Sequence, residues 1–73
     1  MDYSFDYSKL RGRIVEKFGT LKAFYEHLHI TPEMAYRKLN GIAGFSQNDI
    51  VEWCGLLGIA LKEVGIYFFT LKV

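Results

Sequence analysis

The side chains that could bind a metal or act as nucleophiles are few in this sequence. The two histidines, His27 and His29, are two positions apart, which places them on different faces of a helix. Cys54 is the single cysteine, so the sequence offers too few ligands for a zinc site. We expect Cys54 to be a small buried apolar residue and His29 to lie at the surface in a turn. The sequence therefore predicts neither a metal nor a cofactor.

The sequence also lacks the combinations of residues that form catalytic sites. No nucleophile is paired with a base and a third orienting group, and no glycine-rich phosphate loop can be recognised. A chain of 73 residues is also short for a sizeable substrate pocket. We therefore expect no catalytic residues, no small-molecule substrate and no enzymatic activity. Protein-binding and DNA-binding functions remain.

Charge and hydropathy indicate which partners and which cellular location to expect for the protein. The formal net charge is +1, whereas a protein that binds duplex DNA usually carries a stronger basic patch. No stretch approaches the roughly 18 apolar residues of a membrane-spanning helix, and the N-terminus lacks the features of a signal peptide. A chain without disulfides suits a reducing compartment. We expect a cytoplasmic protein without a membrane partner.

Helix start and stop signals divide residues 1–73 into a single domain of five helices. An N-cap residue, a hydrophobic staple or a capping box marks most of the starts. The staples pair Phe5 with Leu10 and Phe45 with Ile50, and Asp49 completes a capping box with Ser46. The expected helices start after Asp6, Thr20, Thr31, Ser46 and at about Ala60, and they end near Phe18, Leu28, Leu39, Leu57 and Phe68.

The spacing of apolar residues predicts which faces are buried. The strongest helical pattern, at i, i+3, i+4 and i+7, is formed by Ile50, Trp53, Cys54 and Leu57. The other residues expected to face the interior are Leu10, Ile14, Phe18, Ala23, Phe24, Leu28, Met34, Ala35, Leu39, Leu61, Val64 and Phe68. The run 66–69 is more apolar than closure of the core requires, so we expect part of it, Tyr67 and Phe69, to contact another chain. Gly12, inside the first helix, would be explained by close packing.

The second and third helices form a pattern with functional meaning. They lie within about residues 20–40 and are joined by the short turn 29–31. Two short capped helices joined in this way are typical of a helix-turn-helix motif, whose second helix enters the major groove of DNA. The sequence thus predicts an all-α helix-turn-helix domain.

Three segments carry a resemblance to a known family: GTLKAFYEHLHITPEMAYRKLNG, GFSQNDIVEWCGLLGI and the YFF near the C-terminus. They resemble the Cro/CI-type helix-turn-helix proteins, in particular the short regulators of phages and prophages of Gram-positive bacteria. The resemblance covers about residues 5–73. It implies a five-helix, lambda-repressor-like fold, a role in transcription regulation at a lysogeny switch, and a location in the cytoplasm of a bacterial host.

The residues that depart from the family pattern lie in the helix-turn-helix motif. Leu21, Tyr25 and His29 stand where family members tend to carry Gln, Ala and Gly. The early exposed positions of the third helix include Glu33 and Tyr36, and none is the Arg, Gln or Asn that makes bidentate contacts with bases. This pattern resembles the modulator-of-repression (antirepressor) proteins of temperate phages. These proteins bind a CI-type repressor and alter its operator binding.

Two functions follow from the resemblance. In the first, a CI-type repressor docks on a face centred on Tyr25, Glu33, Met34 and Tyr36, with Arg37 and Lys38 at its rim, and operator DNA is bound only weakly or within a complex. In the alternative, a Cro-like repressor reads DNA itself, and the candidate DNA contacts are Thr31, Lys22, Arg37 and Lys38. The residues Arg11, Arg13, Lys17 and Lys22 form either a basic contact stripe or a solvated face.

Overall fold

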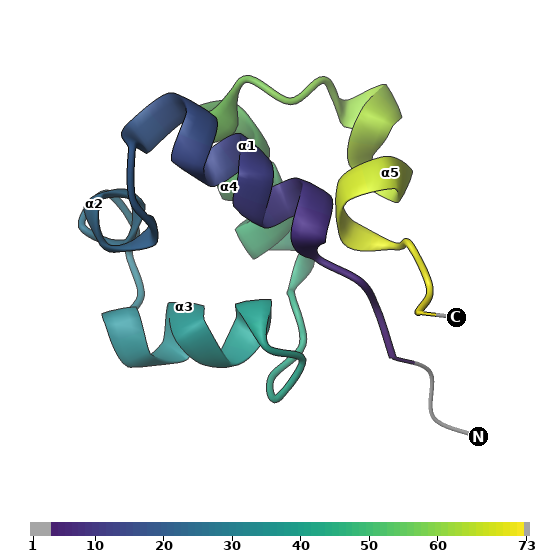
Figure 1. Ribbon diagram of the computed structural model, residues 1–73, viewed down its shortest axis with the longest axis horizontal. Helices are drawn as coiled ribbons and strands as arrows, with labels where there is room; N and C mark the ends of the chain where they lie inside the picture. The colour runs from purple at the N-terminus through teal and green to yellow at the C-terminus, as the bar shows by residue number, and fades with distance from the viewer. Residues whose placement is uncertain (1–3, 73) are drawn as a thin grey trace.

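The computed structural model describes residues 4–72, which fold into five α-helices and one 3₁₀ turn (Figure 1). The elements are α1 (Ser8–Phe18), α2 (Leu21–Tyr25), α3 (Pro32–Leu39), α4 (Gln47–Leu57), η1 (Leu61–Glu63) and α5 (Val64–Phe68). The predicted all-α class is confirmed. In Figure 1, α1 runs above α3, α2 lies at one side between them, and α5 lies at the opposite side.

Side-chain caps fix three helix starts as predicted. The hydroxyl oxygens of Thr20 and Thr31 accept hydrogen bonds from the third residue of the helix that follows each of them. Ser46 and Asp49 form the full capping box of α4. The prediction for α1 was one residue off, because the N-cap is Tyr7; the Asp6 carboxylate nevertheless accepts a hydrogen bond from the Ser8 N–H at 2.8 Å. Local sequence therefore determines most of the helix boundaries.

Two helices are shorter than predicted. α2 ends at Tyr25 rather than Leu28, because the backbone tightens there: the N–H groups of His27 and Leu28 bond to carbonyls three residues back. The connection to α3 is thus longer than the predicted three-residue turn. The last helix is divided into η1 and α5, with Ala60 as the N-cap of η1. Short 3₁₀ turns of this kind are common at helix ends.

Aromatic rings form the centre of the core. Trp53 is fully buried and makes edge-to-face contacts with Phe24 and Phe45, whose ring centroids lie 5.0 and 4.8 Å away. Phe45 also packs edge to face against Phe68 at 5.0 Å. Edge-to-face pairs of this kind add about 0.5–1.5 kcal/mol beyond the buried area. These contacts join α2, α4 and α5 around one apolar centre.

The structure confirms most of the predicted core and corrects two residues. Phe24, Ala35, Leu39, Trp53, Cys54, Leu57 and Phe68 are buried, and Leu28, Ile50 and Val64 are half-buried. Met34 and Leu61 were expected inside, but 38% of Met34 and 64% of Leu61 is exposed. Met34 lies on the outward side of α3, and Leu61 lies in the 3₁₀ turn, where helical spacing no longer applies.

The chain ends lie side by side. Phe5 and Leu71 form an isolated antiparallel bridge, with hydrogen bonds from the Asp6 N–H to the Thr70 carbonyl (2.7 Å) and from the Lys72 N–H to the Ser4 carbonyl (2.9 Å). We call residues 4–6 and 70–72 the terminal ribbon. Among residues 4–72, no helix is long and apolar enough to cross a membrane.

Candidate protein-interaction face

The outer side of α3 is the most exposed part of the predicted motif. Thr31 and Pro32 start the helix, while Ala35 and Leu39 anchor its inner side in the core. The outer side exposes Glu33, Met34, Tyr36 and Arg37. Tyr36 is 56% exposed, so much of its large amphipathic ring is open to a partner. Since Tyr and Arg are typical anchors of protein interfaces, this surface has the composition of a docking site.

Tyr25 joins this surface from α2. Its side chain is half-buried, and burial raises the pKa of its phenol. The Arg11 cation acts to lower this pKa and the Tyr36 phenol acts to raise it, so each of these two side chains lies close enough to Tyr25 to interact with it electrostatically. Tyr25 thus lies near the outer side of α3, and its role in binding stays a prediction.

Arg11 is a member of this surface that sequence reasoning did not identify. Its Nη2 donates to the Leu39 carbonyl at 2.5 Å and to Asn40 Oδ1 at 3.3 Å. Arg11 therefore caps the C-terminal end of α3, where carbonyls lack partners in the helix. The Asn40 amide in turn donates to the Tyr36 carbonyl at 2.8 Å. We call Tyr25, Glu33, Met34, Tyr36 and Arg37, with Arg11 and Asn40, the α3 face.

Lys38 does not belong to the α3 face, contrary to both sequence predictions for it. Only 8% of the residue is exposed, and its ammonium lies 2.7 Å from Asp49 Oδ2 and 2.7 Å from the Gly44 carbonyl oxygen. It also lies 5.9 Å from the centre of the Phe45 ring. The helical register explains the error: Lys38 follows Ala35 by three positions and shares its inner side. It cannot contact DNA or rim an interface without breaking this ion pair.

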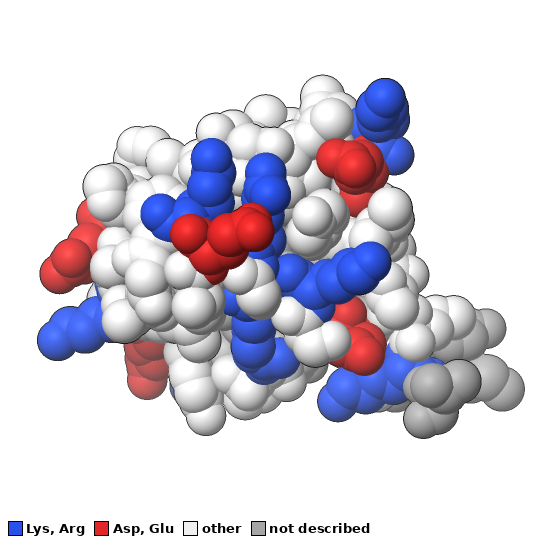
Figure 2. All heavy atoms as spheres, turned by 45° about the horizontal axis from the view of Figure 1, so that its top comes forward, with Lys and Arg blue, Asp and Glu red and all other residues white. Residues whose placement is uncertain are grey.

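The other basic residues of the sequence stripe have different roles. Arg13 donates from Nε to the Leu57 carbonyl (2.9 Å) and from Nη2 to the Gly58 carbonyl (3.1 Å), so it caps α4 as Arg11 caps α3. Lys17 and Lys22 are exposed. The two arginines are therefore not simply solvated: they are half-buried, and their charges stabilise helix C-termini. Figure 2 shows acidic side chains interspersed among the basic ones on the side that comes forward from the top of Figure 1.

The remaining predicted positions fall as follows. Thr31 is exposed, and its hydroxyl oxygen is used by the α3 cap. The side chain of His29 is 90% exposed, as expected for a turn, and pairs with Glu52 of α4. Burial raises the pKa of the Cys54 thiol, which disfavours the reactive thiolate. In the described part of the chain, no three His, Cys, Asp or Glu side chains come together as metal ligands.

Comparison with known proteins places the chain in a family. The family model described as "Protein of unknown function (DUF739)" matches residues 3–71. The chain belongs to this family. Among curated proteins, no match was found.

A solved structure is similar to this member of the family over most of its length. It is the solution structure of the modulator of repression of the temperate bacteriophage TP901-1 from Lactococcus lactis. The two share 30% sequence identity with a TM-score of 0.80, and the match covers 90% of this chain and 89% of that one. Because the identity reaches 30% over nearly the whole of both chains, the two proteins are similar in sequence as well as in fold.

Proposed function

We propose that this protein regulates a phage lysogeny switch by binding a CI-type repressor through the α3 face and altering its operator binding. The observation that carries the proposal is the composition of this face: exposed Tyr36, Met34 and Glu33 stand where a DNA reader would present base-contacting amides and guanidinium groups. The similarity to a phage modulator of repression points to the same class of function.

The helix arrangement supports this proposal. α2 and α3, with their threonine caps, would form the helix-turn-helix unit of a Cro/CI-type domain. The two helices would keep the packing of a DNA-binding motif, but the second helix would bind a protein instead of DNA. The proposal also includes that the protein has no enzymatic activity and is located in the bacterial cytoplasm.

The charge of the α3 face favours a mechanism in which the protein covers the repressor's DNA-reading surface. The DNA-reading surface of a repressor is basic, because it must face phosphates. Glu33, in the first turn of α3, would present a carboxylate to that surface and compete with phosphate for the same side chains. Tyr36 and Tyr25 would supply the apolar contact area. The repressor would then be unable to reach its operator, and repression would be lifted.

The burial of Lys38 weakens the alternative, a Cro-like repressor that reads DNA alone. Of the four candidate DNA contacts, Lys38 is held in the interior by its ion pair with Asp49. The exposed cations that remain, Lys22 and Arg37, are few for a phosphate-binding surface.

A paired experiment tests the proposal. Calorimetry of the intact chain with the CI-type repressor of the same phage should give saturable binding. A gel shift across salt concentrations should show that the chain alone binds operator DNA only in the non-specific range of about 10⁻⁴–10⁻⁶ M. Adding the chain to a repressor–operator complex should change the shifted band. A nanomolar, sequence-specific shift by the chain alone would favour the Cro-like function instead.

A further inference from the structure

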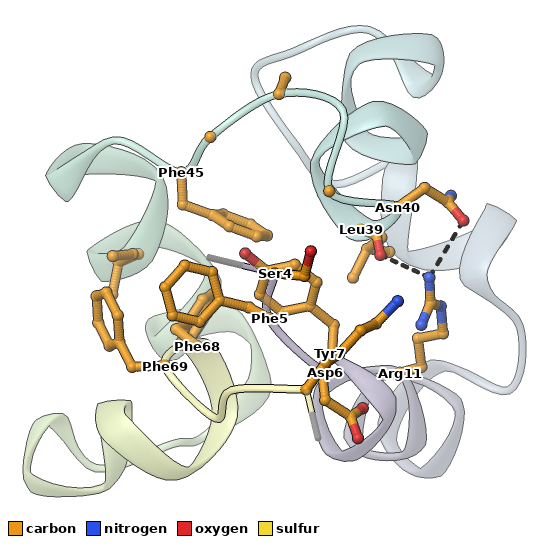
Figure 3. A pocket seen from close by; sticks show the side chains of 15 residues that line it. Ser4, Phe5, Asp6, Tyr7, Arg11, Leu39, Asn40, Phe45, Phe68 and Phe69 are labelled. Carbon is orange, nitrogen blue, oxygen red and sulfur yellow. Dashed lines mark hydrogen bonds between the residues drawn. The ribbon is translucent and has the colours of Figure 1, made fainter. Parts of the chain in front are cut away.

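A groove of about 480 Å³ runs along the terminal ribbon. One wall is the segment Ser4–Tyr7, and the other is formed by residues 39–41 and 43–45 that follow α3. Figure 3 shows Phe68 and Phe69 at one end of this groove and Arg11 with Asn40 at the other, with Phe5, Tyr7 and Phe45 between them. We call it the terminal groove. Aromatic side chains thus line its middle and one end, and polar or charged residues line much of the rest.

The backbone of the first wall offers an open edge. In the terminal ribbon the hydrogen bonds are made by the residues before and after Phe5, so its own N–H and C=O point away from Leu71. Neither group of Phe5 has a hydrogen-bond partner among residues 4–72. A strand with unpaired backbone groups is a template for a further strand. The edge therefore suits an extended peptide rather than a helix.

Position and charge indicate which peptide would lie there. Arg11 and Asn40 line the groove and also belong to the α3 face, so the two surfaces are continuous. The charged lining residues are Asp6, Arg11 and Lys72, which leave an excess of one positive charge. The occupant should therefore carry a carboxylate for the cations and apolar side chains for the aromatic rings, and belong to the molecule that covers the α3 face.

We propose that the terminal groove receives an extended segment of the bound repressor, which carries a carboxylate and apolar side chains and adds a strand beside Phe5. This inference rests on the proposed function and adds a second contact site to it. The added strand would pair with the Phe5 N–H and C=O, and its alternate side chains would pack between Phe45 and Phe69. Its carboxylate would lie near Arg11 or Lys72.

Amide exchange gives the most specific readout. The chain, labelled with ¹⁵N, is measured by NMR with and without the intact CI-type repressor. Strand addition should slow exchange of the Phe5 amide by about tenfold or more, because a free N–H becomes hydrogen-bonded. The amide of Gln47, in the first turn of α4 where N–H groups lack carbonyl partners within the helix, serves as an internal reference.

Filling the groove gives an independent test. A side chain at Gly44 would point into open space, with nothing within 4 Å of its added Cβ, and Gly44 lines the groove. Gly44→Leu should therefore fold and weaken repressor binding by about tenfold or more. Gly55→Leu is the matched control, because Gly55 is equally unobstructed but lies on α4 outside the groove lining. It should bind as the wild type does.

The outcomes separate the two proposals. Repressor binding with unchanged Phe5 exchange, or full affinity of a folded Gly44→Leu variant, would overturn the groove proposal and leave the α3 face as the sole binding site. No repressor binding by the wild-type chain would overturn the proposed function and the groove proposal with it. Protection of Phe5 together with selective weakening by Gly44→Leu would support both.

Discussion

The Lys38 ammonium and the Asp49 carboxylate lie 2.7 Å apart and join the last turn of α3 to the first turn of α4. The Lys38 side chain is 11% exposed and that of Asp49 13%. Asp49 also accepts a hydrogen bond from the Ser46 N–H at 2.9 Å, and Lys38 donates one to the Gly44 carbonyl. One lysine therefore ties together α3, the loop after it and the cap of α4, and so determines how the α3 face is presented.

Removing this lysine should be costly. In Lys38→Met the methylene packing is largely kept, but the Asp49 carboxylate and the Gly44 carbonyl lose their donor. We expect a loss of about 2–3 kcal/mol in the free energy of unfolding, somewhat below the range for fully buried pairs. Urea unfolding followed by circular dichroism measures it. Lys62→Met, at an exposed site, should change stability by less than about 0.5 kcal/mol. Equal stability of the two variants would contradict the structural role of Lys38.

Asp49 should make stability depend on pH in the acid range. Burial acts to raise the pKa of Asp49, but the hydrogen bonds from Lys38 and Ser46 outweigh it and hold the pKa below its usual value of 3.8. A carboxyl with a lowered pKa in the folded state stabilises the fold above its unfolded pKa, and this stabilisation is lost as the pH falls through the folded pKa.

The experiment compares urea midpoints of wild type and Asp49→Asn from pH 6 to about pH 2. The wild type should lose more stability than the variant below about pH 4. Glu33→Gln, which removes an exposed carboxylate, should leave the wild-type pH profile in place. Parallel profiles for wild type and Asp49→Asn would contradict the assignment.

Two glycines should respond with opposite signs to the same substitution. Gly58 ends α4 with φ of +67°, a left-handed conformation in which a Cβ is strained, so Gly58→Ala should destabilise by about 1 kcal/mol. Gly12 lies inside α1 with nothing within 4 Å of an added Cβ, so the expected close packing at Gly12 was wrong. Gly12→Ala should stabilise by up to about 1 kcal/mol. Thermal unfolding measures both, and a shift of the same sign would contradict the prediction.

Arg13 should contribute to stability through its bonds to the end of α4. Arg13→Met removes the donors to the Leu57 and Gly58 carbonyls and should cost about 1–2 kcal/mol. Its ion pair with Glu16, an exposed i, i+3 contact, should account for little of this loss. Lys9→Met, on the same helix, is the control and should be near neutral. If Glu16→Gln cost as much as Arg13→Met, the ion pair rather than the cap would be responsible.

The α3 face should show its role in binding. Tyr36→Ala should weaken repressor binding by about 2 kcal/mol or more, or roughly 30-fold, because it removes a central aromatic anchor. Glu33→Lys should also weaken it by reversing the charge that faces a basic surface. Calorimetry measures both, with helicity checked in parallel. Leu61→Ala removes an equally exposed apolar side chain from the 3₁₀ turn and should not affect binding. If both folded variants bind like wild type, the α3 face is not the repressor site.

Local chemistry in the sequence determined much of this protein. The caps at Thr20, Thr31 and Ser46 and the left-handed Gly58 act within a few residues, so their effects can be read directly from the order of side chains. The apolar spacing around Trp53 likewise indicated the central core residues. The exposure of Tyr36 on the outer side of α3 also followed from this local order.

Tertiary structure decided what depends on residues far apart in the chain. The partners of Arg11 at Leu39 and of Arg13 at Leu57 lie 28 and 44 positions away, so no local pattern reveals that these cations cap helices. Lys38 is charged, and charged residues are seldom buried unless they are paired. Only the fold places Asp49 and the Gly44 carbonyl beside it, and this pairing removes Lys38 from the surface that it was predicted to share with Arg37.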